Sequence, residues 1–445
     1  MLRTSGAVFI ALRAKCAPKP YALTADRDRK AGFGCVRVLL SDGSGLTSRQ
    51  VTVQLAAKGH EVHLLSPDPL CLGRFTRHVR RVHRVPSYGR DPFAWLDATL
   101  EVLGEGFDAL LATHEQVAVL AREVARVRDL GVGLAVPPFA ALRRVQDKIA
   151  AHATLAELSL PQPTTTIARS IDELLIANSL PIYIKTPIGT ASVGVRHVSD
   201  RAALELAAYQ LGAQHAFADG GLLVQQPAAG PLVMVQAVFA DGDLLAWHTN
   251  LRARLGSNGG ASSKRSVLLP DVREHLAQIG GTLRWHGALS LDAVLTPDGP
   301  VYIDVNPRLV EPGNAWHAGV DLVEALLRVT LGDRIDPVAP ARPDIVTHQL
   351  LNALLGAGQL RGTRRAVLAE IIAAARHHGP YRGSREELTP IHGDLFAAVP
   401  VAAAVSALVT APRLWQSFAS NAIASYALTP AGWRAICEPS EGCRP

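Results

Sequence analysis

Cysteines and long apolar runs are scarce in this sequence of 445 residues, and each shortage excludes a class of protein. The five cysteines contain no Cys-x-x-Cys pair, so neither a disulfide framework nor a zinc ribbon is expected, and a reducing cytoplasm fits. The stretch 395–412 is uncharged, but it contains Pro400, is mostly alanine and valine, and is short for a transmembrane helix. We therefore predict a cytoplasmic chain without a stable membrane span.

Dense basic tracts are missing as well. The formal net charge is +6 and the pI is about 9.2, but the charges are spread along the chain without interleaved aromatic residues. Nucleic acid is therefore not expected as a partner; we predict small-molecule substrates, with a homodimer as a further expectation. Only seven of the basic residues are lysines, so a lysine inside a segment predicted to be ordered is informative.

The length and the hydrophobic content of 48% fit two to four domains. An apolar strand at 35–40, a helix at 47–58 and a strand at 61–66 form a βαβ unit, which predicts a parallel sheet. The predicted organisation is a mobile leader at 1–34, a Rossmann-like α/β domain at 35–140, an α+β domain at 141–335 and a helical region at 336–445.

The first strand–helix turn allows a second interpretation, a dinucleotide site. Gly43 and Gly45 supply a G-x-G pattern, but Ser48 stands where a third Gly or Ala is needed for close packing of the helix. A tight turn between strand and helix is the favoured interpretation.

The strongest pattern is a predicted hairpin, "ALSLDAVL" (288–295) and "VYIDVNPR" (301–308), joined by "TPDGP". Centring the loop on Asp298 places Asp292 opposite Asp304, Ser290 opposite Asn306 and Val294 opposite Tyr302. This register places Tyr302 on the same face as the two aspartates. The opposite face of the hairpin is then wholly apolar, which makes a shift of one residue costly.

Two opposed carboxylates repel each other by roughly 3 kcal/mol at ~5 Å and an effective dielectric constant of ~20. A proton, an arginine or a divalent cation must offset that repulsion. Asn306 adds a third oxygen donor, and an all-oxygen set suits Mg²⁺, with Mn²⁺ as an alternative. A solvated polar face paired with Arg308 is the other interpretation that the hairpin allows.

Lys148 and Lys185 lie in segments predicted to be ordered, before the hairpin. Lys185 ends an apolar strand and is followed by a mobile loop, in which Gly189, Thr190, Ser192 and Gly194 could face phosphate. No Walker motif is present, and a flexible hairpin with an exposed lysine is the alternative. Lys148, in "QDK", lies on a predicted helix at 145–158, before a proline-rich linker.

Together and in this order, these segments resemble the ATP-grasp superfamily, most closely the carboxylate–amine ligases related to carbamoyl-phosphate synthase. The resemblance covers about residues 36–335. It implies an α/β domain followed by two α+β lobes that clamp ATP, a lid lobe at about 160–225 and a metal-site lobe at about 226–335, with a helical C-terminal extension.

The resemblance also implies roles for individual residues. Those implied for ATP binding are Lys148, Lys185, Gly189, Thr190, Ser192, Gly194, Gln225 and Gln226. The magnesium ligands would be Asp292, Asp304 and Asn306. Arg308 and Lys185 would serve catalysis. The implied reaction activates a carboxylate as an acyl-phosphate, which an amine or a thiol attacks, with release of ADP.

The sequence departs from the family pattern at two points. The family usually has glutamate at the position of Asp304 and in the hinge, where this chain has Gln225 and Gln226. These departures keep open an alternative, a nucleotide-binding regulatory or scaffold protein without catalysis. The Gly/Ser-rich stretch 254–265 is interpreted as a loop, either closing over phosphates with Arg254, Lys264 and Arg265 or lying disordered on the surface.

Overall fold

The computed structural model describes residues 34–176, 179–190 and 193–438. Of the predicted leader, 1–34, all but Gly34 lies outside the described residues. From Cys35 onward the chain forms one compact unit, so the domain boundaries proposed within it stay predictions. Among the described residues no helix is long and apolar enough to cross a membrane.

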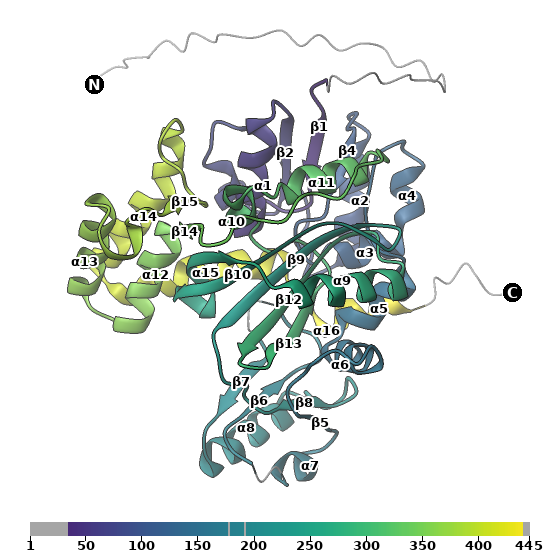
Figure 1. Ribbon diagram of the computed structural model, residues 1–445, viewed down its shortest axis with the longest axis vertical. Coiled ribbons are helices and arrows are strands. Elements are labelled where there is room, and N and C mark those ends of the chain that lie inside the picture. The colour runs from purple at the N-terminus through teal and green to yellow at the C-terminus, as the bar shows by residue number, and fades with distance from the viewer. Residues whose placement is uncertain (1–33, 177–178, 191–192, 439–445) are drawn as a thin grey trace, which may run out of the picture. The chain divides into compact units, whose positions relative to one another are not determined.

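The first part contains a four-stranded parallel sheet in the order β3-β2-β1-β4. Strands β1, β2 and β4 are labelled in Figure 1. Its strands are β1 (Arg37–Leu40), β2 (Glu61–Ser66), β3 (Val79–Arg84) and β4 (Ala109–Leu111). Its helical elements are α1 (Leu46–Ala57), η1 (Leu72–Arg74), α2 (Pro92–Leu103), α3 (Val117–Arg122) and α4 (Val124–Arg128). The predicted parallel sheet is thus confirmed, and β1 and β4 are the neighbours between which the strand order reverses.

The helix predicted at 145–158 is two helices, α5 (Phe139–Gln146) and α6 (Lys148–Glu157). Asp147 separates them because its backbone is extended, and its side chain accepts hydrogen bonds from the N–H groups of Ile149 and Ala150. This break places Lys148 in the first turn of α6.

An antiparallel sheet in the order β5-β8-β6-β7 comes next. Its strands are β5 (Thr165–Ala168), β6 (Ile182–Lys185), β7 (Val195–Val198) and β8 (Leu222–Gln225), with α7 (Ile171–Leu175) and α8 (Arg201–Ala213) between them. The stretch predicted as a linker therefore contributes β5.

The largest sheet has the order β13-β12-β9-β10-β11-β14-β15. Its long strands are β9 (Leu232–Ala240), β10 (Asp243–Leu255), β11 (Ala261–Val267), β12 (Gly287–Thr296) and β13 (Gly299–Asn306), with η2 (Ser257–Gly259) and α9 (Pro270–Leu283) between them. The interpretation of 254–265 as a loop was wrong. Its glycines are confined to the turn around η2, and the small residues after them form the buried strand β11.

The hairpin of β12 and β13 confirms two predicted pairs, Asp292 with Asp304 and Ser290 with Asn306. The predicted five-residue loop was wrong, because Gly299, with φ of 115°, pairs with Thr296 and shortens the connection to two residues. Val294 therefore lies opposite Val301, not Tyr302.

A β-bulge at Ile303 restores the register, because Asp292 pairs with Asp304 but Ala293 pairs with Tyr302. The bulge also turns Tyr302 onto the apolar face, where it is 1% exposed within the core. The predicted position of Tyr302 beside the aspartates was therefore wrong.

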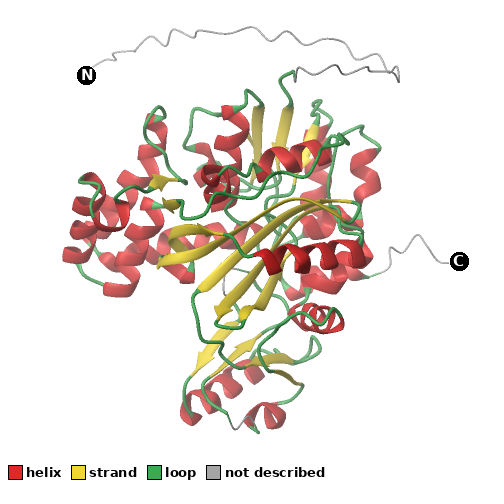
Figure 2. Cartoon of the chain, in the orientation of Figure 1, coloured by secondary structure: helices red, strands yellow, loops and turns green. Residues whose placement is uncertain are grey.

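The C-terminal part is largely helical, as Figure 2 shows, but β14 (Val346–His348) and β15 (Arg385–Glu386) extend the large sheet. Its other elements are α10 (Gly313–Ala318), α11 (Leu322–Thr330), α12 (Leu350–Arg361), α13 (Arg364–Ala375), η3 (Gly379–Tyr381), η4 (Leu395–Ala397), α14 (Ala398–Thr410), η5 (Pro412–Leu414), α15 (Trp415–Tyr426) and α16 (Pro430–Cys437). The predicted fold class, a parallel sheet followed by α+β lobes and a helical extension, is confirmed.

Candidate functional site

The two opposed aspartates form the centre of the candidate site. Burial, and after it the facing carboxylate of Asp304, raises the pKa of Asp292 to about 7, against the opposing effect of Arg308, Lys185 and Arg252. With this pKa, Asp292 carries a proton in about half of the molecules at pH 7, and a bound cation would replace that proton.

The donor set at this point fits a hard divalent cation. Asp292, Asp304 and Asn306 offer only oxygen donors on one face of the hairpin. Within the described residues no group of three His, Cys, Asp or Glu side chains could hold a metal ion. The remaining ligands would therefore have to come from a phosphorylated substrate and water, which is the usual arrangement for Mg²⁺.

Lys148 approaches this centre from the start of α6. Its Nζ donates to the carbonyl of Gly189 at 3.0 Å and lies 3.6 Å from Oδ1 of Asp304. The backbone N–H of Lys148 also donates to the carbonyl of Pro187. The first predicted phosphate lysine thus links the hairpin to the glycine loop.

Lys185 is buried at the end of β6. Its Nζ donates to Oε1 of Gln225 at 2.8 Å and to the carbonyl of Ile303, the bulged residue, at 2.7 Å. Burial lowers its pKa, whereas Asp304 raises it. The bulge thus presents a carbonyl to the lysine one residue before the predicted metal ligand.

The loop predicted to face phosphate is held by its own backbone. The backbone N–H of Val193 donates to the carbonyl of Thr190, and that of Thr186 donates to the carbonyl of Gly194, whose φ is 85°. A Cβ at Gly189 would stand 2.2 Å from the carbonyl of Val193, so this position admits only glycine. Ser192 lies outside the described residues.

The two hinge glutamines differ. Gln225 is buried and joins Lys185 to the hydroxyl of Thr165. Gln226 points elsewhere, donating from its side chain to the carbonyl of Ser179 and from its backbone to that of Thr164. Their assignment to ATP binding stays a prediction.

Arg308 is buried and turned toward the parallel sheet. Its Nη2 and Nε donate to Oε1 of Glu115, at 3.1 and 3.3 Å, and Nη2 lies 3.5 Å from Oδ1 of Asn306. The other oxygen of Glu115 accepts from Gln146. Glu115 was missed in the sequence, although its place after a parallel strand is where ligand sites gather.

The first strand–helix turn is not open to a pyrophosphate. Oδ2 of Asp42 accepts from the N–H groups of Ser44 and Gly45, which a dinucleotide would need. The ring of His114 lies against Gly45 and stacks on Tyr426 of α15 at 3.9 Å between centroids. The C-terminal region therefore covers the edge of the parallel sheet at this point.

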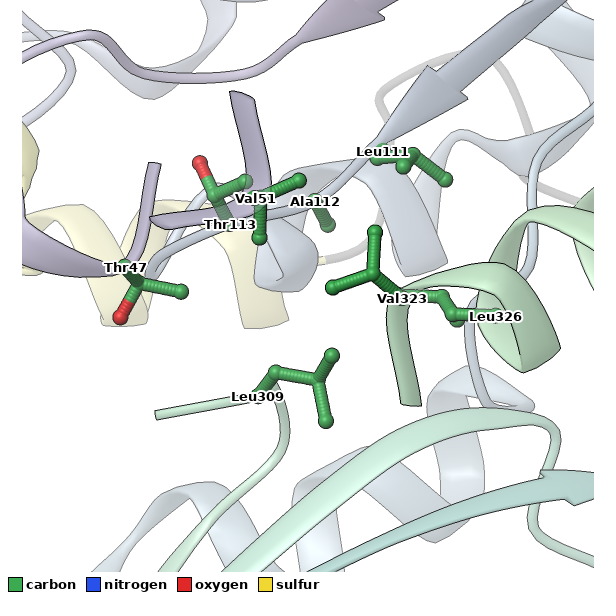
Figure 3. A pocket seen from close by; sticks show the side chains of 8 residues that line it. All are labelled: Thr47, Val51, Leu111, Ala112, Thr113, Leu309, Val323 and Leu326. Carbon is green, nitrogen blue, oxygen red and sulfur yellow. The ribbon is translucent and has the colours of Figure 1, made fainter. Parts of the chain in front are cut away.

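The pocket in Figure 3 lies nearby but is chemically different. Six of its eight lining side chains are apolar, and they come from α1, β4 and the residue that follows it, α11 and the residue after Arg308. Its polar atoms are the hydroxyls of Thr47 and Thr113. With no charged group in its lining, it offers nothing to a phosphate or a metal ion.

No family model and no curated protein sequence matches this chain. Solved structures do match. A carboxyaminoimidazole ribonucleotide synthase from Aspergillus clavatus, complexed with ATP, has a TM-score of 0.58 and 15% identity over 84% of this chain and 99% of its own.

Two other matches have different activities. The biotin carboxylase domain of Hydrogenobacter thermophilus 2-oxoglutarate carboxylase, with MgADP and bicarbonate, has a TM-score of 0.56 and 16% identity over 70% of this chain and 73% of its own. An L-amino acid ligase from Bacillus licheniformis has a TM-score of 0.51 and 18% identity over 66% of this chain and 74% of its own. With its parallel N-terminal sheet, two further sheets and helical C-terminal region, the chain has the ATP-grasp fold.

Proposed function

We propose that the protein is an ATP-dependent ligase that joins a carboxylate to an amine or a thiol. A carboxylate oxygen of the donor attacks the γ-phosphorus of ATP, and the bond to ADP breaks, giving an acyl-phosphate. The acceptor then attacks the acyl carbon, phosphate leaves, and the acceptor loses its proton. Such phosphoryl transfer needs positioning and charge neutralisation more than a protein nucleophile.

The observation that carries this proposal is the convergence of two lysines on the opposed aspartates. Lys148 lies 3.6 Å from Asp304, and Lys185 is bound to the carbonyl next to it. In the proposed site both lysines contact phosphate oxygens and offset their negative charge. Arg308, held by Glu115, would stabilise the acyl-phosphate.

Asp292, Asp304 and Asn306 would hold Mg²⁺, which when bound would neutralise phosphate charge during the transfer. The donor chemistry of these residues supports the assignment, since all three present oxygen on one face of the hairpin. The matched structures that contain ATP or MgADP support ATP as the cosubstrate.

The test is a screen for ADP release with purified protein, Mg²⁺ and ATP against amino acids and small carboxylic acids. We expect ADP and phosphate to appear only with a productive pair. Formation of AMP and pyrophosphate would contradict the proposal. Tight binding of Mg·ATP without turnover across the screen would favour the alternative, a regulatory or scaffold protein.

A further inference from the structure

The sheet face that carries Asp292 continues from β12 across β9 and β10. Ser290 pairs with Gln236 of β9, which pairs with His248 of β10. Two residues further along β12, Asp292 pairs with Met234 of β9, which pairs with Asn250 of β10. Directly paired residues share a face, so these side chains extend outward from the candidate metal site.

Three polar side chains on this face, Gln236, His248 and Asn250, are completely buried. We call them the amide row. Among the described residues Asn250 has no hydrogen-bond partner for either amide atom, and neither Nε2 of Gln236 nor Nδ1 of His248 has one. Buried polar groups without partners are costly and rare, which points to a group that the row receives from outside the chain.

Each unpaired side-chain atom of the amide row can be assigned as a hydrogen-bond donor or acceptor. The amide nitrogen of Asn314 donates to Ile345 and Thr347, so its oxygen accepts from Nε2 of His248 at 2.8 Å. Burial lowers the pKa of His248 to about 4, so the ring is neutral and its Nδ1 accepts.

Gln236 and Asn250 complete the set. Oε1 of Gln236 accepts from the N–H of Val310 at 3.3 Å, which leaves its NH₂ group as a free donor. Asn250 offers a donor and an acceptor together. The row therefore complements a ligand group that accepts and donates side by side.

The charges of the surroundings indicate that this ligand group is neutral. None of the three residues in the row carries a charge, given the neutral ring of His248. The nearby cation Lys264, on the same face, is paired with both Glu311 and Glu387. Arg252, two residues along β10 from Asn250, donates to the carbonyl of Gly259. A charged ligand group in the row would therefore have the uncharged side chains of the row as its direct partners, which is much costlier than burying a neutral group.

We propose that the amide row binds a carboxamide or ureido group in the body of the substrate, and so selects substrates of that class. The proposal rests on the proposed function, since it concerns the substrate of the same site. The segment 310–314 covers the row through Val310 and Asn314, so the substrate group enters when that segment shifts. An internal water molecule held by the row is the competing explanation.

The experiment compares two matched pairs of probes that differ only in the amide: L-asparagine with L-leucine, and succinamate with 4-methylpentanoate. Binding to the full chain is measured by calorimetry with Mg²⁺ and a non-hydrolysable ATP analogue. We expect the amide member of at least one pair to bind roughly tenfold or more tightly than its apolar partner.

The decisive variant is Asn250→Leu, which removes the buried amide with little change of volume and should fold, because it deletes an unpaired polar group. We expect the preference for the amide member to vanish while affinity for the ATP analogue is unchanged. Gln236→Met should reduce the preference in part, and Gln210→Met, on the exposed side of α8, should leave it intact.

Equal binding of both members of each pair, absence of probe binding, or a preference that survives Asn250→Leu would each overturn the inference. If Asn250→Leu only raised thermal stability, the row would hold no more than water. Failure of the wild-type chain to bind the ATP analogue would instead count against the proposed function, so the two failures are distinguishable.

Discussion

The guanidinium of Arg308 donates from Nη2 to Oε1 of Glu115 at 3.1 Å, across a separation of 193 residues in the chain. The arginine that follows the aspartate hairpin is therefore held by a carboxylate at the edge of the parallel sheet. In the proposed site this contact fixes the position of the guanidinium that would meet the transferred phosphate. The side-chain carboxylate of Glu115 itself bonds to Arg308 and Gln146, neither of which is a predicted metal ligand.

Glu115→Gln should slow ADP release in the productive pair by roughly 10- to 100-fold, because a misplaced Arg308 no longer meets the reacting group. Affinity for Mg·ATP should change little, since the lysines and aspartates stay in place. Steady-state kinetics and calorimetry separate the two effects, with the exposed Glu101→Gln as the matched control. An equal loss of nucleotide affinity and of turnover would show that Glu115 serves the nucleotide site instead.

Asp304→Asn should lower the Mg²⁺-dependent affinity for ATP by roughly tenfold or more, about 1.4 kcal/mol, because the metal loses a charged ligand. Asp298→Asn, in the exposed turn of the same hairpin, is the control and should bind as the wild type does. Calorimetric titrations with and without Mg²⁺ measure the difference. An unchanged Mg²⁺ dependence in Asp304→Asn would remove the hairpin from the metal site.

Mg²⁺ affinity should rise with pH and level off above about pH 7, because the metal competes with the proton on Asp292. The slope should be roughly tenfold per pH unit below that point. In the metal-free protein the raised pKa has the opposite effect: the protonated carboxyl stabilises the fold at low pH, and this contribution is lost as the pH rises through 7.

Asp292→Asn is the control for that pH dependence, because ATP itself also titrates near neutrality. Titrations between about pH 5.5 and pH 8 should give a shallower slope for the variant than for the wild type. Identical slopes would assign the pH dependence to the nucleotide alone.

Lys264→Met should lower the free energy of unfolding by about 3–5 kcal/mol, because it leaves the buried Glu387 and the partly buried Glu311 without their cation. Lys58→Met, which breaks a partly exposed pair with Asp321, should cost about 0–1 kcal/mol. Urea denaturation measures both. A cost for Lys264→Met no larger than that for Lys58→Met would show that the two glutamates find other partners or take up protons.

The sequence predicted that the two aspartates share one face of the hairpin, and it drew attention to Lys148 and Lys185. Alternation with a period of two places Asp292 and Asp304 on the polar face. Their exact pairing was predicted through a five-residue loop that is in fact shorter, and it holds because the bulge at Ile303 offsets that error. The scarcity of lysine then drew attention to Lys148 and Lys185. Each of these signals lies within a short segment, so it can be read from the amino-acid sequence alone.

What only the tertiary structure decided depends on contacts between distant segments. The bulge that turns Tyr302 inward and offers the carbonyl of Ile303 to Lys185 depends on neighbours more than a hundred residues away. The pairing of Arg308 with Glu115 could not be predicted for the same reason, since 193 residues separate them in the chain. The stretch 254–265 was misread because Gly and Ser favour loops, yet small residues also suit a strand buried between two neighbours, and burial follows from packing rather than from composition.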